Sequence, residues 1–182
     1  MLTPTKSTLK CSGVYNEYIC LLRGINVSGK NIIKMEHLRI HLKSIKLQGV
    51  QTYIQSVNII FNTEEKNINK IQRLILTKIK KEYNFQVKAI IKTKEQILDT
   101  YKKIPFKNTD ASKTLITFLS EPINPKEATK LLELYKSNTE EIIITKDTIY
   151  LHCPNGYGKT KLSNPLIEKK LKTSATTRNI KT

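Results

Sequence analysis

The order in which apolar runs and amphipathic stretches follow one another is the feature that most constrains the fold of this chain. Short β-branched runs predict strands, and apolar residues that recur at helical spacing predict helices. In the first half of the chain these patterns predict strand, helix, strand, strand, helix and strand. The segments are Glu17–Leu22, Met35–Ile45, Val50–Ile54, Ile59–Phe61, Glu65–Tyr83 and Val87–Ile91. Glycine is common just after a helix, and Gly49 is therefore expected to end the first helix.

This order is that of the ferredoxin-like fold. The second half of the chain starts the same order again, which indicates an internal duplication. Its predicted elements are a strand at Thr114–Leu119, a helix from Pro125, a hairpin of Glu141–Ile144 and Ile149–Cys153, and a helix at Asn164–Leu171. We therefore expect an α+β fold with two related subdomains, the first ferredoxin-like (β-α-β-β-α-β), in which mostly antiparallel sheets carry helices packed on one face.

The same patterns predict where the subdomains begin and end. Residues 1–15 are expected to form a loose N-terminal leader, residues 16–93 the ferredoxin-like subdomain and residues 94–113 a helical connector whose helix stops before Pro105. Residues 114–182 form the second α+β subdomain with a C-terminal tail. The tail, from Lys172, has no apolar periodicity and is expected to be ordered only if it docks on another part of the chain.

The charge of the chain points toward anionic partners without identifying one. The 182 residues include 32 Lys and Arg against 15 Asp and Glu, a formal net charge of +17. Four of the basic residues are Arg, the rest are Lys, and Ile and Asn are also abundant. A nucleotide-composition bias and a nucleic-acid surface both account for this mixture, and both interpretations stay open.

The cysteine and hydropathy patterns predict a compartment. Cys11, Cys20 and Cys153 are odd in number and form no C-x-x-C pair, which fits neither a disulfide framework nor a zinc site. The N-terminus lacks the apolar region of a secretory signal, and no stretch is apolar enough to span a bilayer. We expect a soluble, cytoplasmic protein with no membrane partner.

Two polar segments are predicted to meet at one end of the first sheet. In the ferredoxin-like order the first two strands run parallel, so the loop from Arg23 to Asn31 and the turn from Gln55 to Asn58 share an end, roughly 10 Å apart. The loop has two glycines that allow backbone N–H groups to turn inward, and Arg23 offers a planar donor fork for phosphate or carboxylate. An anion site is one interpretation. The other is that the glycines only make the turn, Asn26 and Asn58 bond to the loop backbone, and Arg23 pairs with a local carboxylate.

Three other motifs carry weaker predictions. Residues 154–161 resemble the end of a P-loop, but Cys153 stands where that motif needs glycine, which leaves a glycine-rich anion-binding turn or a plain connection. His37 and His41 share a helix without a third ligand, and we predict no metal site. Cys20 and Cys153 are each expected to be a buried, inert thiol. No catalytic constellation can be recognised, and no cofactor is predicted.

Four motifs, in the same order, are similar to those of the bacterial family known as domain of unknown function 1697. They are YICLLRGINVSGKN (18–31), TYIQSVNIIF (52–61), GYGKTKLSN (156–164) and TTRN (176–179). The resemblance implies a cytoplasmic α+β protein with two related subdomains and no established activity. The chain has Ser28 and Val57 where the family usually has glycine, and Ile180 where it has an aromatic residue.

The resemblance also selects candidate ligand-binding residues. They are Arg23, Gly24, Asn26, Lys30, Gln55, Ser56, Asn58, Lys161, Arg178 and Asn179. Our leading hypothesis is that they enclose a small ligand bearing phosphate or carboxylate. The alternative is non-specific binding of nucleic acid through a Lys-rich surface. The oligomeric state does not follow from the sequence.

Overall fold

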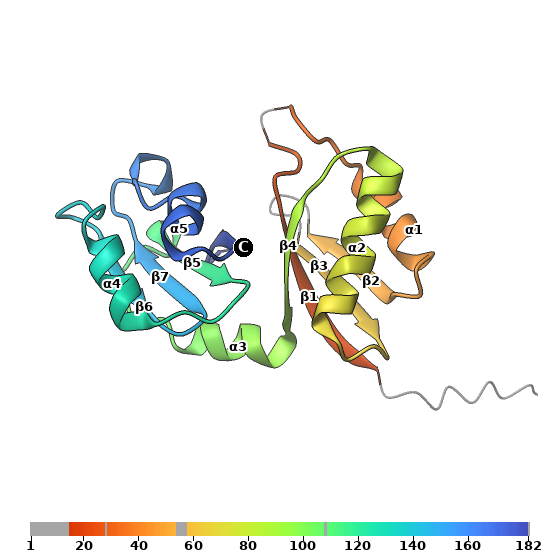
Figure 1. Ribbon diagram of the computed structural model, residues 1–182, viewed down its shortest axis with the longest axis horizontal. Coiled ribbons are helices and arrows are strands. Elements are labelled where there is room, and N and C mark those ends of the chain that lie inside the picture. Colours follow the sequence, from red (N-terminus) through yellow and green to blue (C-terminus); the bar gives the residue numbers. More distant parts are fainter. Residues whose placement is uncertain (1–14, 28, 54–57, 108, 182) are drawn as a thin grey trace, which may run out of the picture.

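The computed structural model describes residues 15–27, 29–53, 58–107 and 109–181 and shows two four-stranded antiparallel sheets (Figure 1). In the first sheet the strands lie in the order β2-β3-β1-β4. Its elements are β1 (Asn16–Arg23), α1 (Met35–Lys43), β2 (Gln48–Tyr53), β3 (Asn58–Thr63), α2 (Ile68–Tyr83) and β4 (Lys88–Thr93). This is the ferredoxin-like arrangement that the sequence predicts.

The second sheet has the equivalent strand order, β6-β7-β5-β8. It follows the connecting helix α3 (Lys94–Lys102) and consists of β5 (Thr114–Leu119), α4 (Pro125–Glu133), β6 (Glu141–Ile144), β7 (Thr148–His152), α5 (Asn164–Leu171) and β8 (Ala175–Asn179). The fold is therefore α+β with two related subdomains, as predicted, and the duplication is visible in the topology of both halves.

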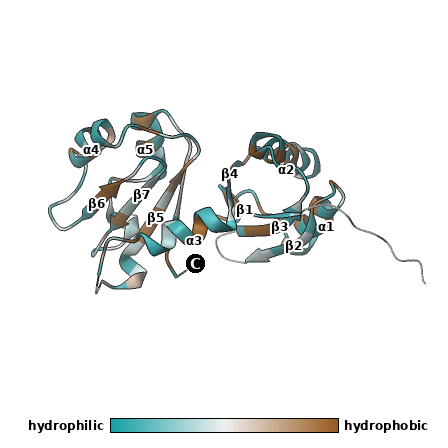
Figure 2. Cartoon of the chain, turned by 90° about the horizontal axis from the view of Figure 1, so that it is seen from below, coloured by the Kyte–Doolittle hydropathy of each residue, from teal (hydrophilic) through white to brown (hydrophobic). Residues whose placement is uncertain are grey.

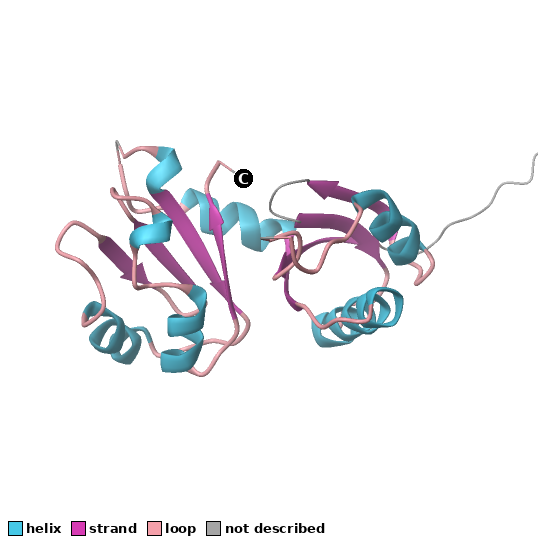
Figure 3. Cartoon of the chain, turned by 90° about the horizontal axis from the view of Figure 1, so that it is seen from above, coloured by secondary structure: helices cyan, strands magenta, loops and turns pink. Residues whose placement is uncertain are grey.

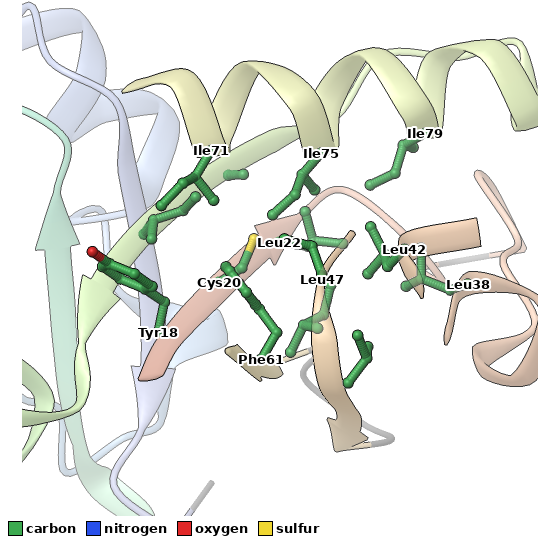
Figure 4. Close-up of a cluster of buried hydrophobic side chains, with 14 of the residues drawn as sticks. Tyr18, Cys20, Leu22, Leu38, Leu42, Leu47, Phe61, Ile71, Ile75 and Ile79 are labelled. Carbon is green, nitrogen blue, oxygen red and sulfur yellow. The ribbon is translucent and has the colours of Figure 1, made fainter. Parts of the chain in front are cut away.

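Alternation along the strands gives each sheet two apolar faces. On β1, Tyr18, Cys20 and Leu22 point toward the helices and pack with Ile71 and Ile75 of α2, as Figure 4 shows. Phe61 of β3 lies in the same cluster. An equivalent cluster in the second subdomain lies between its sheet and helices α4 and α5. Each subdomain thus has a core of its own.

The helix-free faces of the two sheets form a third apolar cluster. Ile19 and Leu21 of β1 and Ile90 of β4 cluster there with Ile116 and Phe118 of β5. Helix α3 bridges the subdomains (Figure 2), and Ile180, just after β8, packs against the same cluster (Figure 3). The two halves are therefore joined through an apolar layer between their sheets.

The structure corrects the predicted end of the first helix. Helix α1 ends at Lys43, and Lys46 takes the left-handed turn with φ 66°. Gly49 lies in β2, beside the irregular pairing between Gln48 and Gln51, with φ 58°. A Cβ at this position would lie 2.9 Å from the Nδ2 atom of Asn62. Gly49 therefore serves the β-bulge and not the helix terminus.

The C-terminal tail is partly a strand. Residues Ala175–Asn179 form β8, which pairs antiparallel with β5. Ala175 and Thr176 are buried in this pairing. The tail thus docks on the second sheet. From the sequence, the tail is expected to be ordered only if it docks in this way. The predicted leader up to residue 14 lies outside the described residues, and no helix of the described part is long and apolar enough to cross a membrane.

Candidate functional site

A cavity of about 290 Å³ lies between the two sheets. Its walls are mainly apolar, and the amide and guanidinium side chains at its lining belong to residues that the sequence singled out, Asn58, Arg178 and Asn179. The lining consists of Ile19, Leu21, Tyr53, Asn58, Ile60, Ile97, Tyr101, Ile116, Phe118, Arg178, Asn179 and Ile180. Residues from both subdomains and from α3 therefore line the cavity.

The strand registers explain why residues so distant in sequence meet here. Asn58 is paired with Leu21, and Arg178 is paired with Ile116. Paired residues of antiparallel strands point to the same face of a sheet. Both pairs lie on the helix-free faces, so the side chains of Asn58 and Arg178 meet across the gap between the sheets.

Arg178 is held by neutral oxygen atoms from both subdomains. Its Nε donates to Oδ1 of Asn58 at 2.8 Å, and its Nη2 donates to the carbonyl of Leu22 at 2.6 Å. Its Nη1 donates to Oγ1 of Thr176 and to the carbonyl of Thr177. All the acidic side chains of the sequence belong to the described residues, and none of them forms an ion pair with Arg178. Burial lowers the pKa of the guanidinium to about 10, which leaves it charged at neutral pH.

Arg23 is engaged with the other subdomain. Its Nη1 and Nη2 donate to Oε1 and Oε2 of Glu168 on α5, each at 2.9 Å, and Nη1 also donates to the carbonyl of Ala175. Lys88 of β4 donates to the same carboxylate at 2.8 Å. Arg23 thus pairs with a carboxylate from far along the chain, not with the local one that the sequence interpretation considered, and it does not line the cavity.

The loop after β1 is closed by its own polar groups. Asn26 donates from Nδ2 to the carbonyl of Ile33 and accepts the N–H of Ile33 on Oδ1, while Asn31 donates to the carbonyl of Gly24. Gly24 and Asn26 have positive φ. Lys30 is exposed. The geometry of Gly24 and Asn26 serves the turn, and none of these residues lines the cavity.

The remaining predicted residues separate into three groups. Lys161 is exposed and does not line the cavity, although it follows the glycine-rich turn that contains the 3-10 helix Tyr157–Lys159. Asn179 lines the cavity and donates to the carbonyl of Ser112. Gln55 and Ser56 lie outside the described residues.

No cysteine or histidine is among the described residues that line the cavity. Burial raises the pKa of Cys20 to about 12 and that of Cys153 to about 11, so both thiols are protonated at neutral pH. His41 lies 3.5 Å from Glu82 and packs on Tyr83, while His37 is exposed. Within the described ranges, no three His, Cys, Asp or Glu residues are grouped so that they could hold a metal ion.

Sequence reasoning missed the aromatic residues at the cavity and the carboxylate that holds Arg23. Tyr53 and Tyr101 line the cavity with 51% and 54% of their surface exposed. The segment around Arg178 carries no apolar alternation that would have marked it as a strand facing another sheet. Nothing local marks Glu168 as the partner of a residue in the other subdomain.

The fold and the cavity define a class, a duplicated ferredoxin-like protein with an apolar site between its two sheets. The chain belongs to the family described as Protein of unknown function (DUF1697), which matches residues 15–150. Among solved structures it is similar to the conserved bacterial protein SP0830 from Streptococcus pneumoniae, with a TM-score of 0.73 and 24% identity over 92% of this chain and 94% of that one. This likeness concerns the fold. The search of curated proteins gives no match.

Proposed function

We propose that the protein binds a small organic anion in the cavity between the sheets, with the guanidinium of Arg178 at the polar end of the site. The observation that carries this proposal is a cation that lines an apolar cavity without an ion pair from any described residue. The proposal keeps the small anionic ligand that the sequence suggested and moves its site from the Arg23 loop to the strand β8.

Removing a charge from water costs free energy. An opposite charge compensates this cost better than neutral dipoles do. Arg178 has only neutral partners, whereas Arg23 close by has a carboxylate with two bonds. A ligand anion that entered the cavity would supply the missing counter-charge. The apolar walls would bury the rest of the ligand, as is usual in small-molecule sites.

A thermal-shift screen with small carboxylates and phosphate esters tests the proposal. A ligand at a hundredfold excess over its Kd stabilises the folded state by about 2.7 kcal/mol, which raises the Tm of a chain of this size by roughly 5–10 °C. The variant Arg178→Gln is expected to lose this shift. Arg73→Gln, the same change at an exposed residue of α2, is the matched control and is expected to keep it.

Because Arg178→Gln removes bonds between the subdomains, a second variant is needed at a residue without that role. Tyr101 lines the cavity from α3 and is half exposed. Tyr101→Ala is expected to fold and to weaken every ligand that stabilises the wild type. If no small anion stabilises the wild-type protein, or if the shift survives in Arg178→Gln, the proposal is wrong.

A second candidate function is non-specific binding of nucleic acid on the outer face of α2. A hollow of about 350 Å³ there is lined by four cations, Lys70, Arg73, Lys78 and Lys81. Two of these, Lys70 and Lys78, are paired with Glu65 and Glu82. Phosphate contacts of this kind make binding strongly dependent on salt.

The slope of log affinity against log salt tests this second candidate with a short RNA and a short DNA duplex. The double variant Lys70→Ala/Arg73→Ala is expected to reduce the slope by about 2, since each lost phosphate contact reduces it by about 1. Lys126→Ala/Lys130→Ala on α4 is the matched control. An absence of binding at low salt in the wild type rejects the candidate.

A further inference from the structure

From the charge and size of the cavity between the sheets we infer that its ligand is a monocarboxylate with a single flat, apolar body, and not a phosphate ester. This inference rests on the proposed function and narrows it to one class of ligand. It uses three properties of the site: the number of charges, the number of donors that remain, and the shape and chemistry of the walls.

The single positive charge at the cavity would be balanced by a ligand with one negative charge. Arg178 is the one charged residue among the described residues that line the cavity. The neighbouring cations have carboxylate partners and do not line the cavity: Arg23 and Lys88 share Glu168, and Lys92 pairs with Asp147. A carboxylate brings one charge and would be balanced, whereas a phosphate monoester is largely a dianion above its second pKa of about 6. Its second charge would be left in an apolar cavity without a counter-charge.

The donors that remain at the site also favour a carboxylate. A guanidinium has five N–H groups. Those on Nε and Nη1 and one on Nη2 have acceptors in the protein, namely Asn58, Thr176, Thr177 and Leu22, so a single N–H on Nη2 has no acceptor among the described residues. Asn179 uses its amide on Ser112 and accepts the N–H of Lys181. Apart from the hydroxyl groups of the half-exposed Tyr53 and Tyr101, the site therefore offers one guanidinium N–H, which is fewer donors than the several that bind a phosphate group elsewhere.

The walls of the cavity fit a small planar body. A volume of about 290 Å³ lies at the lower limit of small-molecule sites, which extend from about 300 to 1,000 Å³. Most of the other side chains that line the cavity are aliphatic or aromatic, among them Ile60, Ile97 and Phe118. Tyr53 and Tyr101 add exposed rings from β2 and α3, and aromatic rings favour stacked or edge-on contact with another ring. A single-ring body fits this space better than a nucleoside does.

A matched series of small probes tests the inference by calorimetric titration at pH 7.5. The series consists of 3-phenylpropanoate, its primary amide, hexanoate and phenyl phosphate. We expect 3-phenylpropanoate to bind at least tenfold more tightly than the amide and than phenyl phosphate, and several-fold more tightly than hexanoate. In Arg178→Gln the carboxylate and the amide are expected to bind equally, and in Tyr101→Ala the advantage over hexanoate is expected to disappear.

The outcomes separate this inference from the proposed function. Tighter binding of phenyl phosphate than of 3-phenylpropanoate overturns the inference and leaves the proposed function standing. Equal binding of the carboxylate and the amide in the wild type contradicts both, because Arg178 would then not act as the counter-charge. Arg178→Lys keeps the charge and is expected to keep part of the preference for the carboxylate, which provides the test if Arg178→Gln fails to fold.

Discussion

The carboxylate of Glu168 links the second subdomain to two cations of the first, Arg23 and Lys88. It receives both ends of the Arg23 guanidinium, the ammonium of Lys88 and the backbone N–H of Ala175. Burial alone would raise the pKa of Glu168, but the hydrogen bonds from Arg23, Lys88 and Ala175 outweigh it, and the pKa is lowered overall. The ionised form is thus the one that the folded state stabilises.

We expect Glu168→Gln to lower the free energy of unfolding at neutral pH by roughly 1–3 kcal/mol, because it leaves a partly buried Arg23 without its counter-charge. The carboxyl group has a lower pKa in the folded state than its unfolded value of about 4.3, so its contribution is complete above that value. The contribution is lost as the pH falls through the lowered folded pKa. Urea unfolding of both proteins from pH 7 to pH 3 is expected to show a difference that shrinks below about pH 4.

The control for this prediction is Glu121→Gln, at an exposed residue of the second subdomain. This variant is expected to unfold like the wild type throughout the pH range. A Glu168→Gln protein that is as stable as the wild type at pH 7 contradicts the assigned ion pair. A difference that grows toward pH 3 contradicts the direction of the pKa shift.

The bulge at Gly49 gives a second prediction at the residue scale. Gly49 has φ 58°, and an added Cβ would meet Asn62 at 2.9 Å. Gly49→Ala is expected to cost about 1–2 kcal/mol of stability, because the strained φ and the close approach both oppose the side chain. At Gly24, with φ 82°, nothing lies within 4 Å, and Gly24→Ala is expected to cost less. Chemical denaturation of the two variants checks this order, and an equal loss would mean that the approach to Asn62 has no effect.

At the scale of elements, β8 is the piece that completes both the second sheet and the site. It pairs with β5, buries Ala175 and Thr176, and carries Arg178 toward the first subdomain. We expect truncation after Lys172 to abolish the cooperative thermal transition of the second subdomain, because the truncation uncovers β5 and removes buried contacts of α5. Truncation after Ile180 is the control and is expected to melt like the wild type. A single unchanged transition in the shorter protein would show that β8 is dispensable.

Most elements could be predicted from the sequence because their apolar residues repeat with a clear period. The isoleucines of α2 and the β-branched run of β4 are examples. Strand β8 has the sequence ATTRN, which shows no apolar alternation, and its order comes from pairing with β5. Gly49 was misassigned because a glycine after a helix and a glycine in a bulge look alike in sequence. The terminus of α1 is instead set by the left-handed turn at Lys46.

The candidate site could be predicted only in part, because some of its contacts join residues that lie far apart in the sequence. The motifs selected Asn58, Arg178 and Asn179, which the structure brings to one cavity. They also selected Arg23, whose partner Glu168 lies 145 residues away and could not be found by local reasoning. The apolar character of the cavity depends on the two sheets facing each other, and this contact between subdomains follows from tertiary packing and not from any local pattern.

At the scale of the whole molecule, the apolar layer between the sheets joins two subdomains that each have a complete core. Phe118 of β5 is buried in this layer, with 4% of its surface exposed, and it lines the cavity. A charge at this position would not remain buried without a partner. Phe118→Asp is therefore expected to separate the sheets while both helix-facing cores stay folded, at a loss of about 3–5 kcal/mol of coupling.

Two measurements check this separation. The far-UV circular dichroism of Phe118→Asp at 20 °C is expected to match that of the wild type, while thermal unfolding changes from one transition to two. Limited proteolysis is expected to cut faster within residues 103–107, since this segment includes Ile104 and Phe106, which pack against the layer. The control is Leu134→Asp, at a leucine with 78% of its surface exposed, and it is expected to change neither result. If Phe118→Asp unfolds in one transition with unchanged proteolysis, the subdomains are coupled chiefly by the polar contacts of Arg23 and Arg178, because the apolar layer would then contribute little to their association.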